Sequence, residues 1–425
     1  MKLAVVVQRY GADISGGAEL HARYIAERLA KHADVEVLTT RATDYITWKN
    51  EFPEGEERVN GVPVRRFSVS RKRNKVEFGH RSRWVFEHQH SIAEELRWMN
   101  SQGPTSPALI RHIRRVQAEF DFFIFFSFRY YHAYHGPIAV PAKSILVPTA
   151  ERDPVLGLGI FGPVFRGVRA IMYNSHEERA LIDSISRRRG PGVVVGVGSN
   201  VPDRVQPGRF KKKYNVHRPF AIYVGRIDVN KGCGEMFDFF QQYAARTPRG
   251  MDLILIGSKH LEIPAHPRIK HLGFVPEEDK FDAMAAADLL IMPSPYESLS
   301  MVTLEAWALG KPVLANAKCD VLKGQCLRSN AGLIYDNVEE FCEGLYMLES
   351  TGPAGAILGR HGREYFRRNY TWPVIERKYL DMFDRLKRDP AAPAMDPLPG
   401  WFARRRRSQP PANEVLEKTP GVVLP

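Results

Sequence analysis

The sequence predicts an α/β protein with two domains, each built on a parallel β-sheet. Strand and helix patterns alternate from the first residue, and a second alternating series begins after residue 216. The chain has 425 residues, enough for two or three domains of ordinary size. Its composition, 44% hydrophobic and 26% charged, is that of a globular protein and argues against a fibrous or disordered chain.

The first domain is expected at residues 1–198. A β-rich run at 2–7, a glycine-containing loop at 11–17, a helical pattern at 18–30 and a strand at 35–38 form a βαβ unit. Further strands are predicted at 122–126, 144–147, 170–173 and 193–195, with a helix at 109–119 and another opening at Ser175. This order predicts a parallel sheet covered on both faces.

The second domain is expected at residues 217–365, after a proline- and lysine-rich linker at 199–216. Its strands are predicted at 220–224, 252–256, 289–292 and 312–315, with helices at 235–245, 278–286 and 301–309. Residues 366–388 have the pattern of a closing amphipathic helix. The tail at 389–425 contains 8 prolines and is expected to be disordered.

The sequence places the chain in the cytosol by default. No run approaches the roughly 18 apolar residues of a membrane-spanning helix, and the apolar run at the start is too short for a signal peptide. The 4 cysteines lie far apart without a C-x-x-C pair, which excludes a disulfide scaffold or zinc ribbon by spacing.

The net charge of +13 is concentrated in one stretch. Residues 65–83 hold eight basic residues and one acid, and Arg71, Lys72 and Arg73 form its centre. Such a run attracts phosphates of a nucleic acid, a membrane or a substrate, or it is a solvated loop. Aromatic residues are not interleaved with it, which argues against nucleic acid. The basic run at 401–407 could contact an anionic membrane surface or be solvated.

A phosphate site is predicted where the first strand of the second domain ends. Arg226 and Lys231 stand five residues apart ahead of a helix start. A guanidinium binds two phosphate oxygens as a fork, an ammonium acts as a point charge, and the helix dipole favours the same anion. The alternative is two surface cations in a βα loop.

Two carboxylates follow a later strand of the same domain. Glu297 lies in a loop at the carboxyl end of that strand, and Glu305 lies about one turn into the next helix. Open α/β sheets bind ligands at this end, and a carboxylate accepts hydrogen bonds from neighbouring hydroxyls of a sugar. The amides near Ser298, Leu299 and Ser300 offer an anion site. Alternatively, Glu305 pairs with a surface cation and Glu297 is solvated.

A glycine pair, Gly16 and Gly17, follows the first strand and would let the backbone approach a phosphate. The dinucleotide fingerprint and the Walker A sequence are both missing, and so is a D-x-D pair. A metal clamp on a diphosphate is therefore not expected, and positive side chains would replace it.

Together these motifs resemble the retaining glycosyltransferases of family 4, which have the GT-B fold: two Rossmann-like domains facing across a cleft. The resemblance covers about residues 1–388. It is strongest in the G-R-x-x-x-x-K-G segment, the strand and turn ending at Gly257, the run at 271–275 and the E-x7-E pair.

The resemblance implies a nucleoside-diphosphate sugar as donor, with no cofactor and no metal. Arg226 and Lys231 would hold the diphosphate, and Glu305 the ribose. Glu297 and the loop after it would hold sugar hydroxyls. The remaining implied donor contacts are the backbone near the base and the glycine loop of the other domain: Gly257, Phe274, Val275, Gly16 and Gly17.

The chain departs from the family at Glu151. Close relatives have a histidine there, after a segment similar to residues 145–150, and it contacts the donor sugar. We expect the Glu151 carboxylate to bind a sugar hydroxyl, because a carboxylate beside a diphosphate is otherwise repelled. Proton acceptance from the acceptor, altered donor preference and lost activity are the alternatives.

The expected function is therefore transfer of a hexosyl group to an acceptor hydroxyl with retention of configuration. The acceptor would be a glycan, a lipid-linked or another hydroxyl compound, anionic or membrane-borne if it meets Arg71–Arg73. Cell-envelope polysaccharide or glycolipid synthesis, peripheral on the membrane, would fit. The alternatives are a nucleotide-sugar epimerase of the same fold, or a non-catalytic membrane- or nucleic-acid-binding protein with a degenerate donor site.

Overall fold

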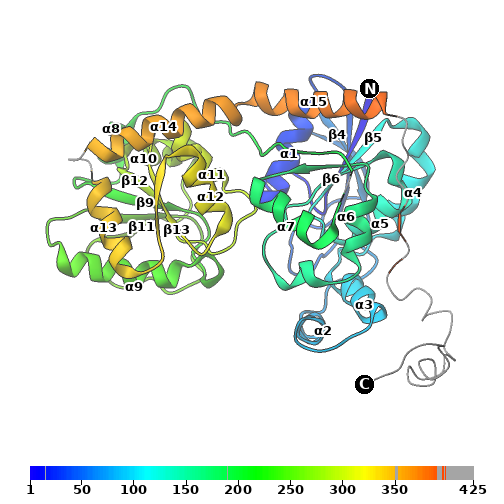
Figure 1. The fold of residues 1–425 in the computed structure, drawn as a ribbon, viewed down its shortest axis with the longest axis horizontal. Coiled ribbons are helices and arrows are strands. Elements are labelled where there is room, and N and C mark those ends of the chain that lie inside the picture. Colours follow the sequence, from blue (N-terminus) through cyan, green and yellow to red (C-terminus); the bar gives the residue numbers. More distant parts are fainter. Residues whose placement is uncertain (15, 189, 350–352, 390–394, 397, 399–425) are drawn as a thin grey trace, which may run out of the picture.

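A computed structural model describes residues 1–14, 16–188, 190–349, 353–389, 395–396 and 398. Two α/β domains lie side by side, with the N-terminal domain on the right and the C-terminal domain on the left of Figure 1. The predicted basic run at 401–407 and most of the predicted tail lie outside the described residues.

The N-terminal domain is built on an eight-stranded sheet of order β3-β4-β2-β1-β5-β6-β7-β8. All neighbours are parallel except the hairpin β3–β4 at one edge. The strand β5 is buried along its whole length, because its run of phenylalanines packs on both faces of the sheet. In sheet order the strands are Gly55–Val59, Val62–Phe67, Asp34–Thr40, Lys2–Val6, Phe122–Phe126, Ser144–Val147, Ala170–Tyr173 and Gly192–Val194.

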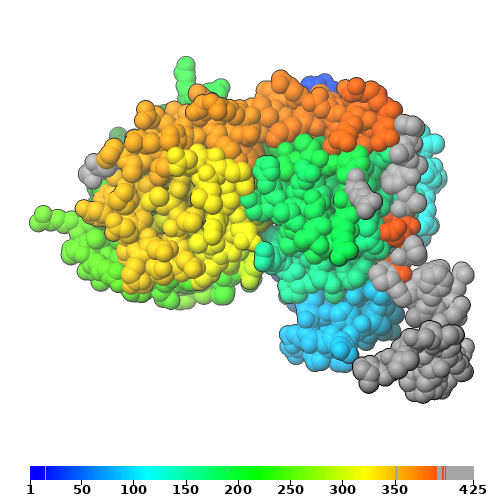
Figure 2. All heavy atoms as spheres, viewed as in Figure 1, coloured from blue at the N-terminus to red at the C-terminus, as the bar shows by residue number. Residues whose placement is uncertain are grey.

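Seven α-helices belong to the described part of this domain. The helices α2 and α3 form a lobe that projects below the rest of the domain in Figures 1 and 2. In chain order, α1 to α7 are Gly17–Leu29, Lys75–Glu87, Ile92–Gln102, Pro107–Val116, Tyr131–Ala139, Phe161–Gly167 and His176–Ser186.

The C-terminal domain has a six-stranded, wholly parallel sheet of order β11-β10-β9-β12-β13-β14. In sheet order its strands are Ile269–His271, Asp252–Ile256, Phe220–Val224, Leu289–Met292, Val313–Asn316 and Gly332–Tyr335. The helices α8 to α14 are Pro207–Lys213, Cys233–Arg246, Glu277–Ala286, Met301–Ala308, Asp320–Ser329, Val338–Leu348 and Pro353–Asn369.

The last helix, α15 (Trp372–Arg388), leaves the C-terminal domain and packs on the N-terminal one, along the top of Figure 1. Trp372 meets Tyr24 of α1 edge to face, and Phe383 stacks on Phe122 of β5 at 5.6 Å between ring centroids. The Trp372 indole also donates to Asn200, at 2.7 Å. This helix therefore ties the two domains together.

The structure differs from the sequence expectation in several segments. The expected closing helix at 366–388 is the end of α14 followed by a separate helix, α15. The expected linker contains a helix, α8, which packs against α10 through ion pairs of Arg209 and Lys213 with Asp279 and Asp282. The stretch 65–83 is not one basic loop either, since it spans the end of β4, a connection and most of α2. No helix in the described part of the chain is long and apolar enough to cross a membrane.

Candidate active site

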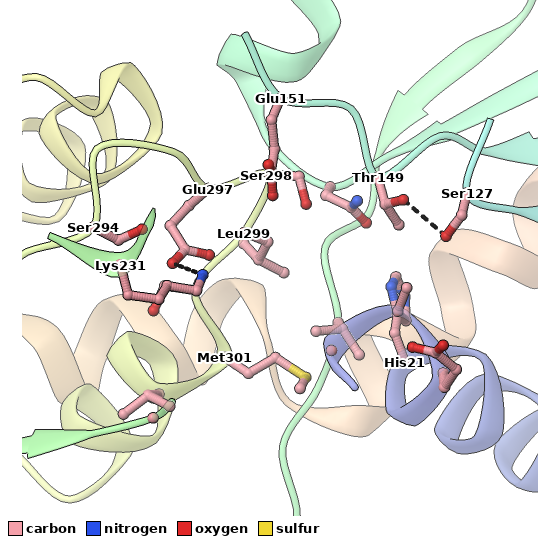
Figure 3. Close-up of a pocket in the computed structure, with 18 of the residues that line it drawn as sticks. His21, Ser127, Thr149, Glu151, Lys231, Ser294, Glu297, Ser298, Leu299 and Met301 are labelled. Atoms are coloured by element: carbon pink, nitrogen blue, oxygen red, sulfur yellow. Dashed lines mark hydrogen bonds and ion pairs between the residues drawn. The ribbon is translucent and has the colours of Figure 1, made fainter. Parts of the chain in front are cut away.

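The carboxyl ends of both sheets meet at a cavity of about 420 Å³ between the domains (Figure 3). That size is typical of small-molecule sites, and the position is where open α/β sheets bind ligands. Both domains contribute, since the loops after β1, β5, β6 and β7 line one wall and those after β9 and β12 line the other.

Lys231 and Glu297 form an ion pair on the C-terminal wall, with 2.7 Å between Nζ and Oε1. The pairing depends on Gly232, which has a φ of 71° and at which a Cβ would collide with the carbonyl of Pro293. This close approach brings the two loops together. Burial lowers the pKa of Lys231, but the Glu297 carboxylate raises it, and the net direction is upward. Lys231 is thus held as a cation.

Ser298, Leu299 and Ser300 line the cavity beside Glu297. Ser300 is the N-cap of α11, and its hydroxyl accepts a hydrogen bond from the Thr303 amide at 3.2 Å. The loop is therefore anchored to the helix that follows it.

Arg226 lies at the edge of the site rather than among the residues that line the cavity. Its guanidinium pairs with Asp228 and donates to the Tyr45 hydroxyl of the other domain at 3.4 Å. Arg226 and Lys231 therefore occupy the same loop region but present their charges at different depths.

Glu305 is buried and does not line the cavity. Its carboxylate accepts hydrogen bonds from Lys280 at 3.1 and 3.2 Å and from the Ser199 hydroxyl at 3.0 Å. The structure thus shows the pairing with a cation that was the alternative for Glu305, although Lys280 is largely buried rather than a surface residue.

The remaining predicted donor contacts are spread around the cavity. Gly17 lines it, whereas Gly16, Gly257, Phe274 and Val275 do not, and the Phe274 side chain is 79% exposed. Gly16, with a φ of 142°, lies against Glu19, whose carboxylate is paired with Arg9 at 2.6 Å.

Glu151 faces the Lys231–Glu297 pair from the N-terminal wall, beside Ser298 in Figure 3. Burial, followed by the nearby Glu297 carboxylate, raises its pKa. Its carboxylate has no hydrogen-bond or ion-pair partner among the described residues, so it is available to a ligand.

Beneath Glu151 lies a second, fully buried carboxylate. Glu178 accepts hydrogen bonds from the amides of Ala150 at 2.6 Å and Asn174 at 2.5 Å. Burial raises its pKa to about 8. Glu178 thereby joins the loops after β6 and β7 and fixes the backbone that carries Glu151.

Several polar residues of the N-terminal wall were not predicted from the sequence, and five of them are considered together. Ser127 and Thr149 have positive φ and join their hydroxyls at 3.0 Å, while three further side chains lie deeper. Four of them follow a predicted strand, and the rule that ligands bind at the carboxyl ends of strands could have identified these four. His21, in the first helix, is the exception. The five are Gln8, His21, Ser127, Thr149 and Asn174.

Arg71, Lys72 and Arg73 do not line the cavity. Arg71 pairs with Glu77, and Lys72 is exposed. Arg73 is half-buried: it donates to the Gln102 carbonyl at 3.0 Å and lies over the ring of Trp48. The stretch is therefore partly neutralised and partly structural, which corrects the expectation of a free basic loop. No group of three or more His, Cys, Asp or Glu side chains in the described residues could hold a metal ion.

Comparison with known proteins agrees with this geometry. Residues 218–350 match the family model described as glycosyl transferases group 1. Mannosylfructose-phosphate synthase of Agrobacterium fabrum is 22% identical over 192 residues, 41% of this chain and 42% of that protein. The chain spans between 32% and 49% of the length of this and three further curated relatives.

Solved structures show the same fold over nearly the whole chain. Sucrose-phosphate synthase of Thermosynechococcus elongatus superposes with a TM-score of 0.67 at 17% identity, over 91% of this chain and 99% of that one. HepE of Anabaena, in complex with UDP-glucose, superposes with a TM-score of 0.64 at 16% identity, over 91% and 100%. The match to the group 1 glycosyl transferase model lies within the C-terminal domain, and the chain as a whole has the two-domain GT-B fold of these solved structures.

Proposed function

We propose that this protein is a retaining glycosyltransferase that moves a sugar from a nucleoside-diphosphate sugar to an acceptor hydroxyl. One observation carries the proposal: the Lys231–Glu297 pair of one domain faces the free carboxylate of Glu151 in the other, across a cavity at the carboxyl ends of both sheets. The complex of HepE with UDP-glucose, a fold neighbour, supports a nucleotide sugar as the ligand class.

Lys231 takes the principal contact with the diphosphate, because its ammonium lines the cavity and is held as a cation. Arg226 contacts the diphosphate at the edge of the cavity, where its guanidinium gives up the hydrogen bond to the Tyr45 hydroxyl and donates to a phosphate oxygen instead. The free amides after Glu297 add partial positive charge on the same side.

The sugar lies between Glu297 and Glu151, whose carboxylates accept hydrogen bonds from its hydroxyls. Glu305 binds the ribose in the position that Ser199 takes here, and Lys280 stays as its counter-ion. The base lies against the backbone near Phe274 and Val275. In this arrangement Lys231 offsets the charge of Glu297 and Lys280 offsets that of Glu305, whereas Glu151 has no ion-pair partner among the described residues.

In the transfer step, the bond between the anomeric carbon and the phosphate oxygen breaks, and its electron pair leaves with the diphosphate. The acceptor oxygen bonds to the same carbon from the same face, and its proton passes to the departing phosphate oxygen. Lys231, Arg226 and the loop amides stabilise the charge that develops on the leaving group, so the step needs no metal. The anomeric configuration is retained.

A thermal-shift series with UDP-, GDP- and ADP-sugars tests the proposal. At least one of them should raise the melting temperature, since a ligand that binds only the folded state stabilises it. The shift should shrink in Glu305→Ala and persist in Glu262→Ala, a matched change at an exposed carboxylate outside the cavity. Absence of any donor-dependent shift in the native protein would contradict the assignment.

A further inference from the structure

Three buried side chains at the base of the N-terminal wall have polar atoms that lack a partner. Gln8, His21 and Asn174 are 1%, 4% and 2% exposed, and all three line the cavity. Gln8 Oε1, His21 Nε2 and Asn174 Oδ1 make no hydrogen bond within the described part of the chain. Buried polar atoms are almost always paired, so three such atoms in one wall indicate a ligand-binding surface.

These three groups are uncharged. Burial lowers the pKa of His21 to about 3, so its imidazole is neutral at physiological pH. The two amide oxygens are acceptors, and the neutral ring nitrogen donates or accepts according to its tautomer. In Figure 3 the His21 ring points toward the paired hydroxyls of Ser127 and Thr149. A surface of this chemistry suits a molecule rich in hydroxyl groups.

The arginines of the same wall are already paired with carboxylates, although the buried Nε of Arg129 has no hydrogen-bond partner among the described residues. Glu19 is paired with Arg9, and Asp153 with Arg129, among the described residues that line or adjoin the cavity. The Glu151 carboxylate forms no ion pair in the described chain; burial and Glu297 raise its pKa, whereas the nearby cations Lys231 and Arg129 favour its charged form. A phosphorylated acceptor would therefore meet repulsion on this wall, whereas a neutral one would not.

We propose that the acceptor is an uncharged, hydroxyl-rich molecule, a sugar or cyclitol without phosphate, held by Gln8, His21 and Asn174. This inference rests on the proposed function. It replaces the anionic acceptor expected from Arg71–Arg73, and it separates this chain from relatives such as mannosylfructose-phosphate synthase, whose name specifies a phosphorylated product.

The experiment compares matched pairs in the presence of UDP: glucose with glucose 6-phosphate, fructose with fructose 6-phosphate, and inositol with inositol phosphate. Isothermal titration of each pair should give tighter binding for the neutral member, by about tenfold or more. Tighter binding of the phosphorylated members, or equal binding, would overturn the inference about the acceptor. The proposed function would still stand if a nucleotide sugar raises the melting temperature. Absence of any nucleotide-sugar binding would overturn both.

Variants of the wall separate ligand contact from a structural role. His21→Phe and Gln8→Leu remove one hydrogen-bonding group each, so the acceptor KM should rise about 3- to 10-fold while the donor Kd is unchanged. His21→Asn, which keeps a polar side chain, should recover part of the loss, and His217→Phe at an exposed site is the control. A KM that stays at the native value in both wall variants would overturn the assignment.

Discussion

The Lys231–Glu297 pair gives the most informative single perturbation of the site. Lys231→Ala removes a charge-assisted contact to the diphosphate, which costs about 1.5–3 kcal/mol, or roughly 10- to 150-fold in Kd. It also leaves Glu297, whose side chain is only 12% exposed, without its cation and beside Glu151. We therefore expect a loss near the upper end of that range.

The double variant Lys231→Ala/Glu297→Gln measures the coupling free energy between the two side chains in donor binding. Once Lys231 is absent, removing the Glu297 charge relieves repulsion toward the diphosphate, so the double loss should fall short of the sum of the single losses by about 1–2 kcal/mol. Titration calorimetry with the nucleotide sugar that gives the largest thermal shift measures all three affinities.

The matched control is Lys259→Ala, because Lys259 pairs with Glu262 on the surface at 2.8 Å and does not line the cavity. Its donor affinity should equal that of the native protein. Two results would refute the role given to the pair. In one, the losses of donor-binding free energy in the single variants add up to the loss in the double variant within about 0.5 kcal/mol. In the other, Lys231→Ala binds the donor within threefold of the native affinity.

Four further outcomes follow from the contacts described. Gly232→Ala forces a side chain into left-handed backbone against Pro293, so it should lower the free energy of unfolding by about 1–3 kcal/mol and weaken donor binding; native values in urea titration would contradict this. Because the folded-state pKa of Glu178, about 8, lies above its ordinary 4.5, stability should be full below about pH 4.5 and fall as the pH rises toward 8. The slope should reach at most about 1.4 kcal/mol per pH unit, and Glu178→Gln should flatten it; an unchanged slope would count against the buried carboxylate. Phe383→Ala should cost about 3–5 kcal/mol, because the fully buried ring stacks between α15 and β5; a loss below 1 kcal/mol would show that α15 is not firmly docked. Arg73→Ala should lower the melting temperature and leave donor affinity unchanged; reduced affinity at native stability would place Arg73 in the site instead.

The sheet strands were predictable where they are buried on both faces. The predicted ranges 122–126, 220–224, 252–256 and 289–292 coincide with β5, β9, β10 and β12, because strands of a parallel sheet are continuous apolar runs. The edge hairpin β3–β4 escaped prediction, since its charged residues, such as Arg65 and Arg66, find their counter-ions only across neighbouring strands.

The residues of the site that lie in local sequence motifs were predictable. Lys231 in the loop after β9 and Glu297 in the loop after β12 were both identified, and the structure joins their side chains in an ion pair. His21 escaped because a lone histidine in a helix pattern has the signature of a core residue. The Lys280 partner of Glu305 escaped because the two lie 25 residues apart on different helices. Such pairings depend on tertiary packing, which has no local signal.

The most direct measurement of the central claim is proton NMR of the native protein with a bound nucleotide sugar and a neutral sugar acceptor. We predict release of the nucleoside diphosphate together with a glycoside whose anomeric proton shows the configuration of the donor. Conversion of the donor to an epimer with no diphosphate released would contradict the account, and so would a product of inverted configuration.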